Sequence, residues 1–210
     1  MRLRRYPAGR SAPTLVLAHG AGAGQDHPWM TGAAQGLADR GVSVVTFDFP
    51  YVAAGRKAPD RGPVLEKFLA ELWGETVGKS RARFFAGGKS MGGRIASQVA
   101  GGHAFSPAAA GLVFFGYPLH PPGKPERRRD RHLPNVACPM LFLHGTRDPF
   151  GSPDEMKALT EGLPGATLHV VEGGNHSLVA RKRDDPERQS IERALDVAAD
   201  WISETRSEAT

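Results

Sequence analysis

The chain has 210 residues, of which 40% are apolar and 23% charged, and it carries a net charge of +5. This size and composition exclude a disordered chain, a collagen-like repeat and a coiled coil. Its uninterrupted apolar runs are far shorter than the roughly 20 residues that span a membrane. We therefore expect one globular domain over residues 1–210 and no membrane partner.

Six short apolar runs predict β-strands, because each is bounded by Gly or Pro as buried parallel strands usually are. They span residues 14–18, 42–49, 83–86, 112–115, 140–143 and 167–171. The residues before Thr14 leave room for one edge strand at most. Between these runs, apolar residues at helical spacing predict helices over residues 28–40, 63–77, 92–100, 153–161 and 186–205. Ser152 is the expected N-cap of the helix that begins at residue 153.

The alternation of strands and helices predicts an α/β fold with a mostly parallel sheet of six to seven strands. Right-handed crossovers then place helices on both faces of the sheet. In such folds, functional residues gather beyond the carboxyl ends of the strands. The polar residues that directly follow each predicted strand are therefore the candidates for a functional site.

The third predicted strand runs into Gly88-Lys89-Ser90-Met91-Gly92, a G-x-S-x-G pattern between a strand and a helix. In this context the pattern is typical of a nucleophile elbow, a sharp turn that exposes the serine hydroxyl. The two glycines let the strand and the helix pass without side-chain clashes. The helix also points the positive end of its dipole at the serine. Ser90 is therefore the candidate nucleophile.

A serine nucleophile needs a base to accept its proton and an acid to orient that base. In nucleophile-elbow folds these residues follow the serine in the order acid, then histidine. Asp148 follows the fifth predicted strand, and His176 lies in a glycine-rich loop after the sixth. Taken singly, each also fits an ordinary turn or loop residue, but with Ser90 they predict a Ser-His-Asp catalytic triad. His19 and His144, which flank strand ends, are expected to be structural.

The expected oxyanion hole consists of two backbone N–H groups that stabilise the negative charge formed during acyl transfer. One comes from Met91, the residue after the candidate nucleophile. The other comes from the glycine-rich segment 19–24, where we favour the amide of Ala21, with that of Gly22 as the alternative. Small residues in this segment allow the backbone to approach a substrate closely.

These motifs resemble the α/β-hydrolase superfamily, and in particular its compact dienelactone-hydrolase-like branch, which has no lid domain. More narrowly, residues 89–93, 143–150 and 174–177 resemble the testis-expressed-protein-30-like family of predicted serine hydrolases. The resemblance extends over nearly the whole chain and implies a triad of Ser90, Asp148 and His176. Dienelactone hydrolases use a cysteine nucleophile, whereas this position is a serine here. The resemblance implies no specific substrate.

The sequence therefore predicts a serine hydrolase that cleaves a carboxylic ester or a related small acyl substrate through an acyl-enzyme intermediate. Esters, thioesters, lactones and amides are all open as substrates, because the same residues serve each of them. The reaction requires no metal and no organic cofactor. The lone Cys138, together with an N-terminus that lacks the apolar stretch of a signal peptide, predicts a cytoplasmic protein. Oligomeric state stays open.

Two alternatives account for parts of the pattern. Gly20, Gly22 and Gly24, followed by Asp48, resemble a dinucleotide-binding fingerprint, but their spacing does not fit G-x-G-x-x-G. We therefore interpret Asp48 as a structural residue that closes a turn before Pro50. The second alternative is a non-catalytic interaction module that retains the α/β-hydrolase fold, because fold alone does not establish activity.

Residues 117–134 lie where related hydrolases insert a lid, but this segment, rich in Pro and Arg, is too short for a lid domain. We therefore expect an open site. Within it, residues 124–132 are strongly basic, and a solvated loop is a simpler interpretation than a phosphate or nucleic-acid patch. We expect no nucleic-acid partner. His120 and Phe150 are candidates for the mouth of the pocket, although ordinary loop residues are the simpler interpretation.

Overall fold

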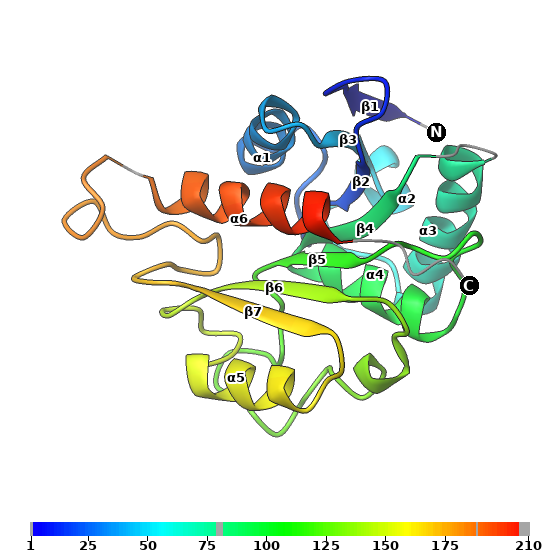
Figure 1. Cartoon of the computed structure of the whole chain (residues 1–210). Helices are drawn as coiled ribbons and strands as arrows, with labels where there is room; N and C mark the ends of the chain where they lie inside the picture. The colour runs from blue at the N-terminus through cyan, green and yellow to red at the C-terminus, as the bar shows by residue number, and fades with distance from the viewer. Residues whose placement is uncertain (1, 79–81, 188, 206–210) are drawn as a thin grey trace.

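The computed structural model describes residues 2–78, 82–187 and 189–205 (Figure 1). The strands in this part of the chain are β1 (Leu3–Tyr6), β2 (Thr14–Ala18), β3 (Ser43–Phe47), β4 (Phe84–Lys89), β5 (Leu112–Phe115), β6 (Met140–Gly145) and β7 (Ala166–Val171). The helices are α1 (Pro28–Asp39), α2 (Pro50–Ala53), α3 (Gly62–Val77), α4 (Met91–Gly101), α5 (Pro153–Glu161) and α6 (Ser190–Glu204), with a short 3-10 helix, η1 (Leu133–Asn135).

The described strands form one sheet of seven, in the order β1-β3-β2-β4-β5-β6-β7. β1 pairs antiparallel with β3 at one edge, and all other neighbours in the sheet are parallel. The predicted fold class is therefore confirmed, including the single edge strand before Thr14. β4, which carries the G-x-S-x-G motif at its end, lies in the centre of the sheet.

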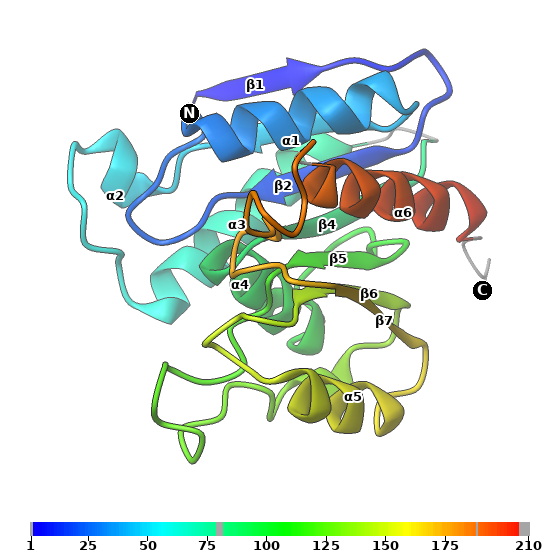
Figure 2. The same ribbon diagram turned by 90° about the vertical axis from the view of Figure 1, so that its left-hand side faces the viewer.

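Helices cover both faces of the sheet (Figure 1; Figure 2). On one face, Leu141 of β6 belongs to a buried cluster with Leu195 of α6 and residues of α1. On the other face, its neighbour Phe142 belongs to a cluster with Trp73 of α3 and Ile95 of α4. Adjacent strand residues thus enter opposite layers of the core. The two layers fix the strand ends relative to one another, and these ends carry the candidate site.

The predicted helices are present, with one correction at the last. Ser152 caps α5 as expected: its hydroxyl accepts the N–H of Glu155, whose carboxylate accepts the N–H of Ser152 at 2.8 Å. The last helix, however, begins at Ser190 and not at residue 186. Its start is delayed because the carboxylate of Asp185 accepts the N–H groups of Gln189 and Ser190, which turns the chain before the helix.

Two short elements were not predicted, because α2 and η1 are too short to show a periodic pattern. η1 is the one regular element among residues 117–134, all of which are described, and no lid covers the described part of the fold. The expectation of a fold without a lid domain is therefore confirmed. No helix among the described residues is both long and apolar enough to cross a membrane.

Candidate active site

The chain turns sharply at Ser90, between β4 and α4. Its φ is 52° and its ψ is −116°, a conformation that costs a residue other than glycine about 1–3 kcal/mol. The turn is possible because Gly88 and Gly92 have no side chains. A Cβ at Gly88 would lie 2.4 Å from the carbonyl oxygen of Ala18, and one at Gly92 would lie 2.3 Å from the same atom. Ser90 thus stands beyond the carboxyl end of the central strand.

Ser90, His176 and Asp148 form a continuous chain of hydrogen bonds. The distance from Nδ1 of His176 to Oδ2 of Asp148 is 2.7 Å, and that from its Nε2 to Oγ of Ser90 is 2.8 Å. Because a carboxylate only accepts, Nδ1 carries the proton of the neutral ring. Nε2 is then free to accept a hydrogen bond from the hydroxyl of Ser90. The three candidate residues, which follow β4, β6 and β7, are therefore brought together.

The surroundings of His176 favour its neutral form. The side chain of Asp148 is fully buried, and that of His176 is 21% exposed. Burial lowers the pKa of His176 from its ordinary value, while the hydrogen bond to Asp148 opposes the shift. An imidazole that is neutral at pH 7 can accept a proton from a nearby hydroxyl.

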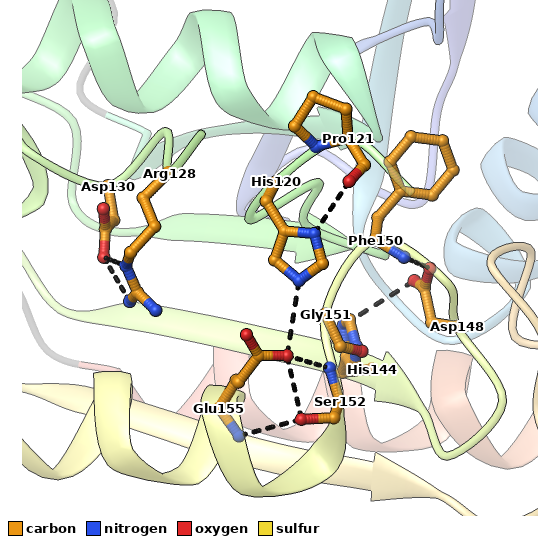
Figure 3. Close-up of polar contacts among 10 residues, drawn as sticks. All are labelled: His120, Pro121, Arg128, Asp130, His144, Asp148, Phe150, Gly151, Ser152 and Glu155. Atoms are coloured by element: carbon orange, nitrogen blue, oxygen red, sulfur yellow. Dashed lines mark hydrogen bonds and ion pairs between the residues drawn. The ribbon is translucent and has the colours of Figure 1, made fainter. Parts of the chain in front are cut away.

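The turn after β6 holds Asp148 in place (Figure 3). The N–H of Phe150 donates to Oδ1 of Asp148 at 2.9 Å, which leaves Oδ2 for His176. Nε2 of His144 lies 2.8 Å from the carbonyl oxygen of Gly151 and donates to it, while Nδ1 faces Oδ2 of Asp148 at 3.7 Å. His144 thus braces the turn that carries the candidate acid, as expected of a structural residue.

The backbone that carries His176 is held by two side chains to which the sequence analysis gave no role. Nζ of Lys89 donates to the carbonyl oxygen of His176 at 2.6 Å, and Nε1 of Trp29 donates to that of Ser177 at 3.1 Å. For Lys89, the sequence feature that could have indicated this role is its position at the end of an apolar strand, directly before the candidate nucleophile. Burial lowers the pKa of Lys89 to about 8.

The glycine-rich segment after β2 is tied to the segment that follows β3. Nε2 of His19 accepts the N–H of Phe49 at 3.1 Å, so His19 has the expected structural role. Asp48 is also structural, but its role needs a correction. Its two carboxylate oxygens accept the N–H and the side-chain amide of Gln25, each at 2.8 Å, so it holds the glycine-rich segment and does not close a turn before Pro50.

The two expected oxyanion donors come from the first residue of α4 and from the segment after β2. Met91 is the first residue of α4, and a helix leaves its first amide N–H groups without intrahelical partners. Ala21 and Gly22 are both exposed. The start of their segment lies close to the elbow, since a Cβ at Gly20 would lie 3.8 Å from Cβ of Ser90. This position is compatible with a donor from either Ala21 or Gly22.

The predicted basic loop is folded by its own contacts. Arg128 forms an ion pair with Asp130, and the N–H of Arg129 donates to the carbonyl oxygen of Leu119 at 2.8 Å. The hydroxyl of Tyr117 donates to the carbonyl oxygen of Arg129 at 2.8 Å. A surface cavity of about 460 Å³ between this loop and α5 is lined by residues that do not include the candidate triad.

The backbone N–H of His120 donates to the carbonyl oxygen of Phe150 at 3.0 Å, but the two side chains have different surroundings. The ring of His120 is buried against the carbonyl oxygen of Pro121, at 2.9 Å, and the carboxylate of Glu155, at 3.3 Å (Figure 3). It therefore connects segment 117–134 to α5, as an ordinary loop residue would. Phe150 instead lies beside the candidate site, with its ring 4.2 Å from that of His176.

The comparisons with known proteins agree with this architecture. The serine hydrolase BPHL of Mus musculus is 37% identical over 62 residues, which are 29% of this chain and 21% of that protein. The match thus spans about a fifth of the relative's length. An alpha-beta serine hydrolase homologue from Coxiella burnetii has a TM-score of 0.71 at 20% identity and covers 93% of this chain and 90% of its own.

A dienelactone hydrolase from Anabaena variabilis has a TM-score of 0.74 at 18% identity, over 98% of this chain and 93% of its own. At these identities the structural likenesses establish a shared fold. The narrower resemblance to the testis-expressed-protein-30-like family stays a prediction. The family model of an alpha/beta hydrolase domain matches residues 11–203. This match supports the prediction of a hydrolase, and the chain belongs to the α/β-hydrolase family.

Proposed function

We propose that this protein is a serine hydrolase that cleaves carboxylic esters. Ser90 is the nucleophile, His176 the general base, and Asp148 the acid that orients the base. The observation that carries the proposal is the chain of two hydrogen bonds, of 2.8 and 2.7 Å, from Ser90 through His176 to a buried carboxylate. A base within hydrogen-bond reach of a nucleophile, itself oriented by a third group, is the arrangement that activates a serine hydroxyl.

The reaction runs through an acyl-enzyme. Oγ of Ser90 attacks the ester carbonyl carbon while Nε2 of His176 accepts the hydroxyl proton. The amide N–H groups of Met91 and Ala21 stabilise the resulting oxyanion. When the tetrahedral intermediate collapses, the bond to the alcohol breaks and His176 returns the proton to the departing oxygen. Water then attacks the carbonyl carbon of the acyl group on Ser90 while His176 accepts a proton from the water. His176 returns this proton to Oγ of Ser90 as the carboxylic acid leaves, which restores the hydroxyl.

The choice of a small ester as substrate rests on the surroundings of the candidate site. The oxyanion segment is exposed at Ala21, and residues 117–134 form a folded loop without a lid. Such a site suits small or surface-presented acyl groups better than long lipid chains, which need an enclosed apolar tunnel. Hydrolases of acyl bonds are also named among the structural relatives, which include a dienelactone hydrolase and an esterase.

A fluorophosphonate probe tests the proposal, because it reacts only with a serine whose base and oxyanion donors are both in place. We expect the wild-type protein to be labelled and Ser90→Ala not to be. Ser97→Ala is the matched control, because Oγ of Ser97 also contacts a histidine, at 2.7 Å from Nε2 of His132, but lies outside the elbow. Its labelling should equal that of the wild type. A folded wild-type protein that is not labelled would refute the proposal and favour the interaction module.

A further inference from the structure

We propose that Lys89 is a positioning residue that holds His176 against Ser90, and that Trp29 acts with it. The inference rests on the proposed role of His176 as the base. In a reaction that depends on a proton transfer over one hydrogen bond, a displacement of about 1 Å can cost about a hundredfold in rate. His176 follows Gly173 and Gly174, so the segment that carries it has little stiffness of its own.

Lys89 links the nucleophile to the backbone of the base. It is the last residue of β4, directly before Ser90, and its side chain lies inside the fold with 9% of the residue exposed. Nζ donates to the carbonyl oxygen of His176 at 2.6 Å. Hydrogen bonds from a charged donor are shorter and stronger than neutral ones. The strand that presents the hydroxyl therefore also binds the residue that must accept its proton.

Trp29 binds the next carbonyl and supports the ammonium group. Its Nε1–H donates to the carbonyl oxygen of Ser177 at 3.1 Å, so consecutive carbonyls of the histidine loop are held by β4 and α1. Nζ of Lys89 lies 5.8 Å from the centroid of the indole, within the range of a cation–π contact. The indole in turn packs edge-on against Phe115 of β5 at 5.5 Å. The pair is therefore anchored in the core.

The imidazole is constrained from the other direction by different residues. Asp148 binds Nδ1, and the ring of Phe150 lies 4.2 Å away. A Cβ at Gly116 would lie 2.5 Å from the carbonyl oxygen of His176, so the backbone just after β5 also packs closely against this loop. Side-chain contacts thus set the tilt of the ring, whereas Lys89 and Trp29 set the position of the backbone that carries it.

Charge gives Lys89 a second effect, which distinguishes it from a simple brace. The charged or titratable groups that face His176 are Asp148, Lys89 and His144. Asp148 raises the pKa of His176, whereas Lys89 and His144 lower it. A protonated Lys89 therefore helps to keep the imidazole neutral and ready to accept a proton. An apolar side chain of similar length would fill the space without this effect.

The test compares the pKa of His176 with turnover in matched variants. The imidazole is titrated by NMR of carbon-labelled histidine, with its signal assigned by its loss in His176→Gln. Turnover of p-nitrophenyl acetate gives kcat and KM. Lys89→Met removes the charge and the donor, and Lys89→Arg restores both. Lys157→Met, at an exposed lysine of α5, is the control.

We expect Lys89→Met to raise the pKa of His176 and to lower kcat about tenfold to a hundredfold with little change in KM. Lys89→Arg should partly restore the low pKa of His176 and the wild-type kcat. Lys157→Met should change neither this pKa nor kcat. Trp29→Phe keeps an aromatic ring but loses the donor to Ser177, so it should lower kcat while the pKa stays low. Its control is Trp201→Phe, at a tryptophan of α6 that packs against Phe85 on the same face.

An unchanged pKa of His176 in a folded Lys89→Met protein would overturn the proposal, as would a kcat equal to that of Lys157→Met. Should Lys89→Met fail to fold, Trp29→Phe decides: a kcat equal to that of Trp201→Phe overturns the proposal. The titration requires no turnover. A wild-type protein that resists the fluorophosphonate would therefore refute the proposed function, while the pKa comparison would still report on the contact of Lys89 with His176.

Discussion

The phenyl ring of Phe150 lies against the imidazole of His176, with 4.2 Å between the ring centroids and 31° between the ring planes. The same residue donates its backbone N–H to Asp148 at 2.9 Å. One turn after β6 therefore both orients the candidate acid and covers the candidate base. Burial is the largest influence on the pKa of His176 and lowers it, and Phe150 supplies part of that burial.

We expect Phe150→Ala to raise the pKa of His176 toward its ordinary value, because water reaches the uncovered ring. The base is active only when neutral, so the acidic limb of the pH–rate profile should move to higher pH and activity near pH 6 should fall. Phe150→Leu keeps an apolar side chain over the imidazole and should shift the acidic limb of the pH–rate profile less. Profiles of kcat/KM from pH 5 to 8 measure both shifts. Superimposable profiles for the wild type and Phe150→Ala would contradict this role of Phe150.

Asp148→Asn should lower kcat by about 10⁴-fold while the protein stays folded, by analogy with the same exchange in serine proteases. The amide would donate to Nδ1 of His176, so the ring proton would move to Nε2. The imidazole could then no longer accept the proton of Ser90. Ester turnover measures the loss, and circular dichroism checks the fold. A loss smaller than tenfold in a folded protein would rule out Asp148 as the orienting acid.

Gly116→Ala should lower activity, because the new Cβ would lie 2.5 Å from the carbonyl oxygen of His176 and push that loop away. Gly116 also has a φ of 69°, which disfavours alanine by itself. Gly123→Ala controls for this strain, since its φ is 70° and no atom lies within 4 Å of its Cβ position. Both variants should lose some stability in urea denaturation. Equal kcat values in the two would show that the close contact does not matter.

The carboxylate of Glu155 should stabilise the protein in a pH-dependent way. Hydrogen bonds from the backbone N–H and hydroxyl of Ser152 lower its pKa from 4.5 to about 2. A lowered carboxyl pKa stabilises the fold above the unfolded value, and this contribution is lost as the pH falls from about 4.5 through about 2. We expect Glu155→Gln to lower the free energy of unfolding at pH 7 by about 1 kcal/mol, the usual contribution of a cap.

Urea denaturation at pH 7, 4 and 2 measures the difference in the free energy of unfolding between the wild type and Glu155→Gln. This difference should shrink toward zero at the lowest pH. Glu161→Gln, at the last residue of the same helix, is the control. Its carboxylate meets Lys157 at 3.9 Å on an exposed surface, where an ion pair contributes little. If the free energies of unfolding of the wild type and Glu155→Gln differed by the same amount at all three pH values, the ionised carboxylate would be excluded as the cause.

Local patterns predicted most of the framework. Apolar runs bounded by Gly mark the central strands, and β2 and β5 have the predicted limits. Because parallel strands end at one edge of a sheet, the residues after β4, β6 and β7 could be grouped before any geometry was known. Together with the G-x-S-x-G motif, the order of the elements was therefore enough to name the triad candidates.

Contacts between distant segments were not accessible in this way. Nothing in the apolar pattern indicates that Lys89 reaches a carbonyl 87 residues further along the chain. The link from Asp48 to Gln25 depends on how two loops face each other after β2 and β3 pair. The start of α6 was placed too early because a carboxylate, that of Asp185, competes for the amides of the first turn. Each case involves a polar side chain whose partner is chosen by tertiary structure.

The distance along the chain between Ser90 and His176 has a consequence for biosynthesis. The serine leaves the ribosome 86 residues before the histidine that contacts it. That histidine follows β7, which pairs with β6 at the far edge of the sheet. During the synthesis of these 86 residues, the hydroxyl of Ser90 has no imidazole partner at position 176. If Ser90 is the nucleophile as proposed, a chain that stops before His176 should not react with acyl groups, because the proposed base is missing.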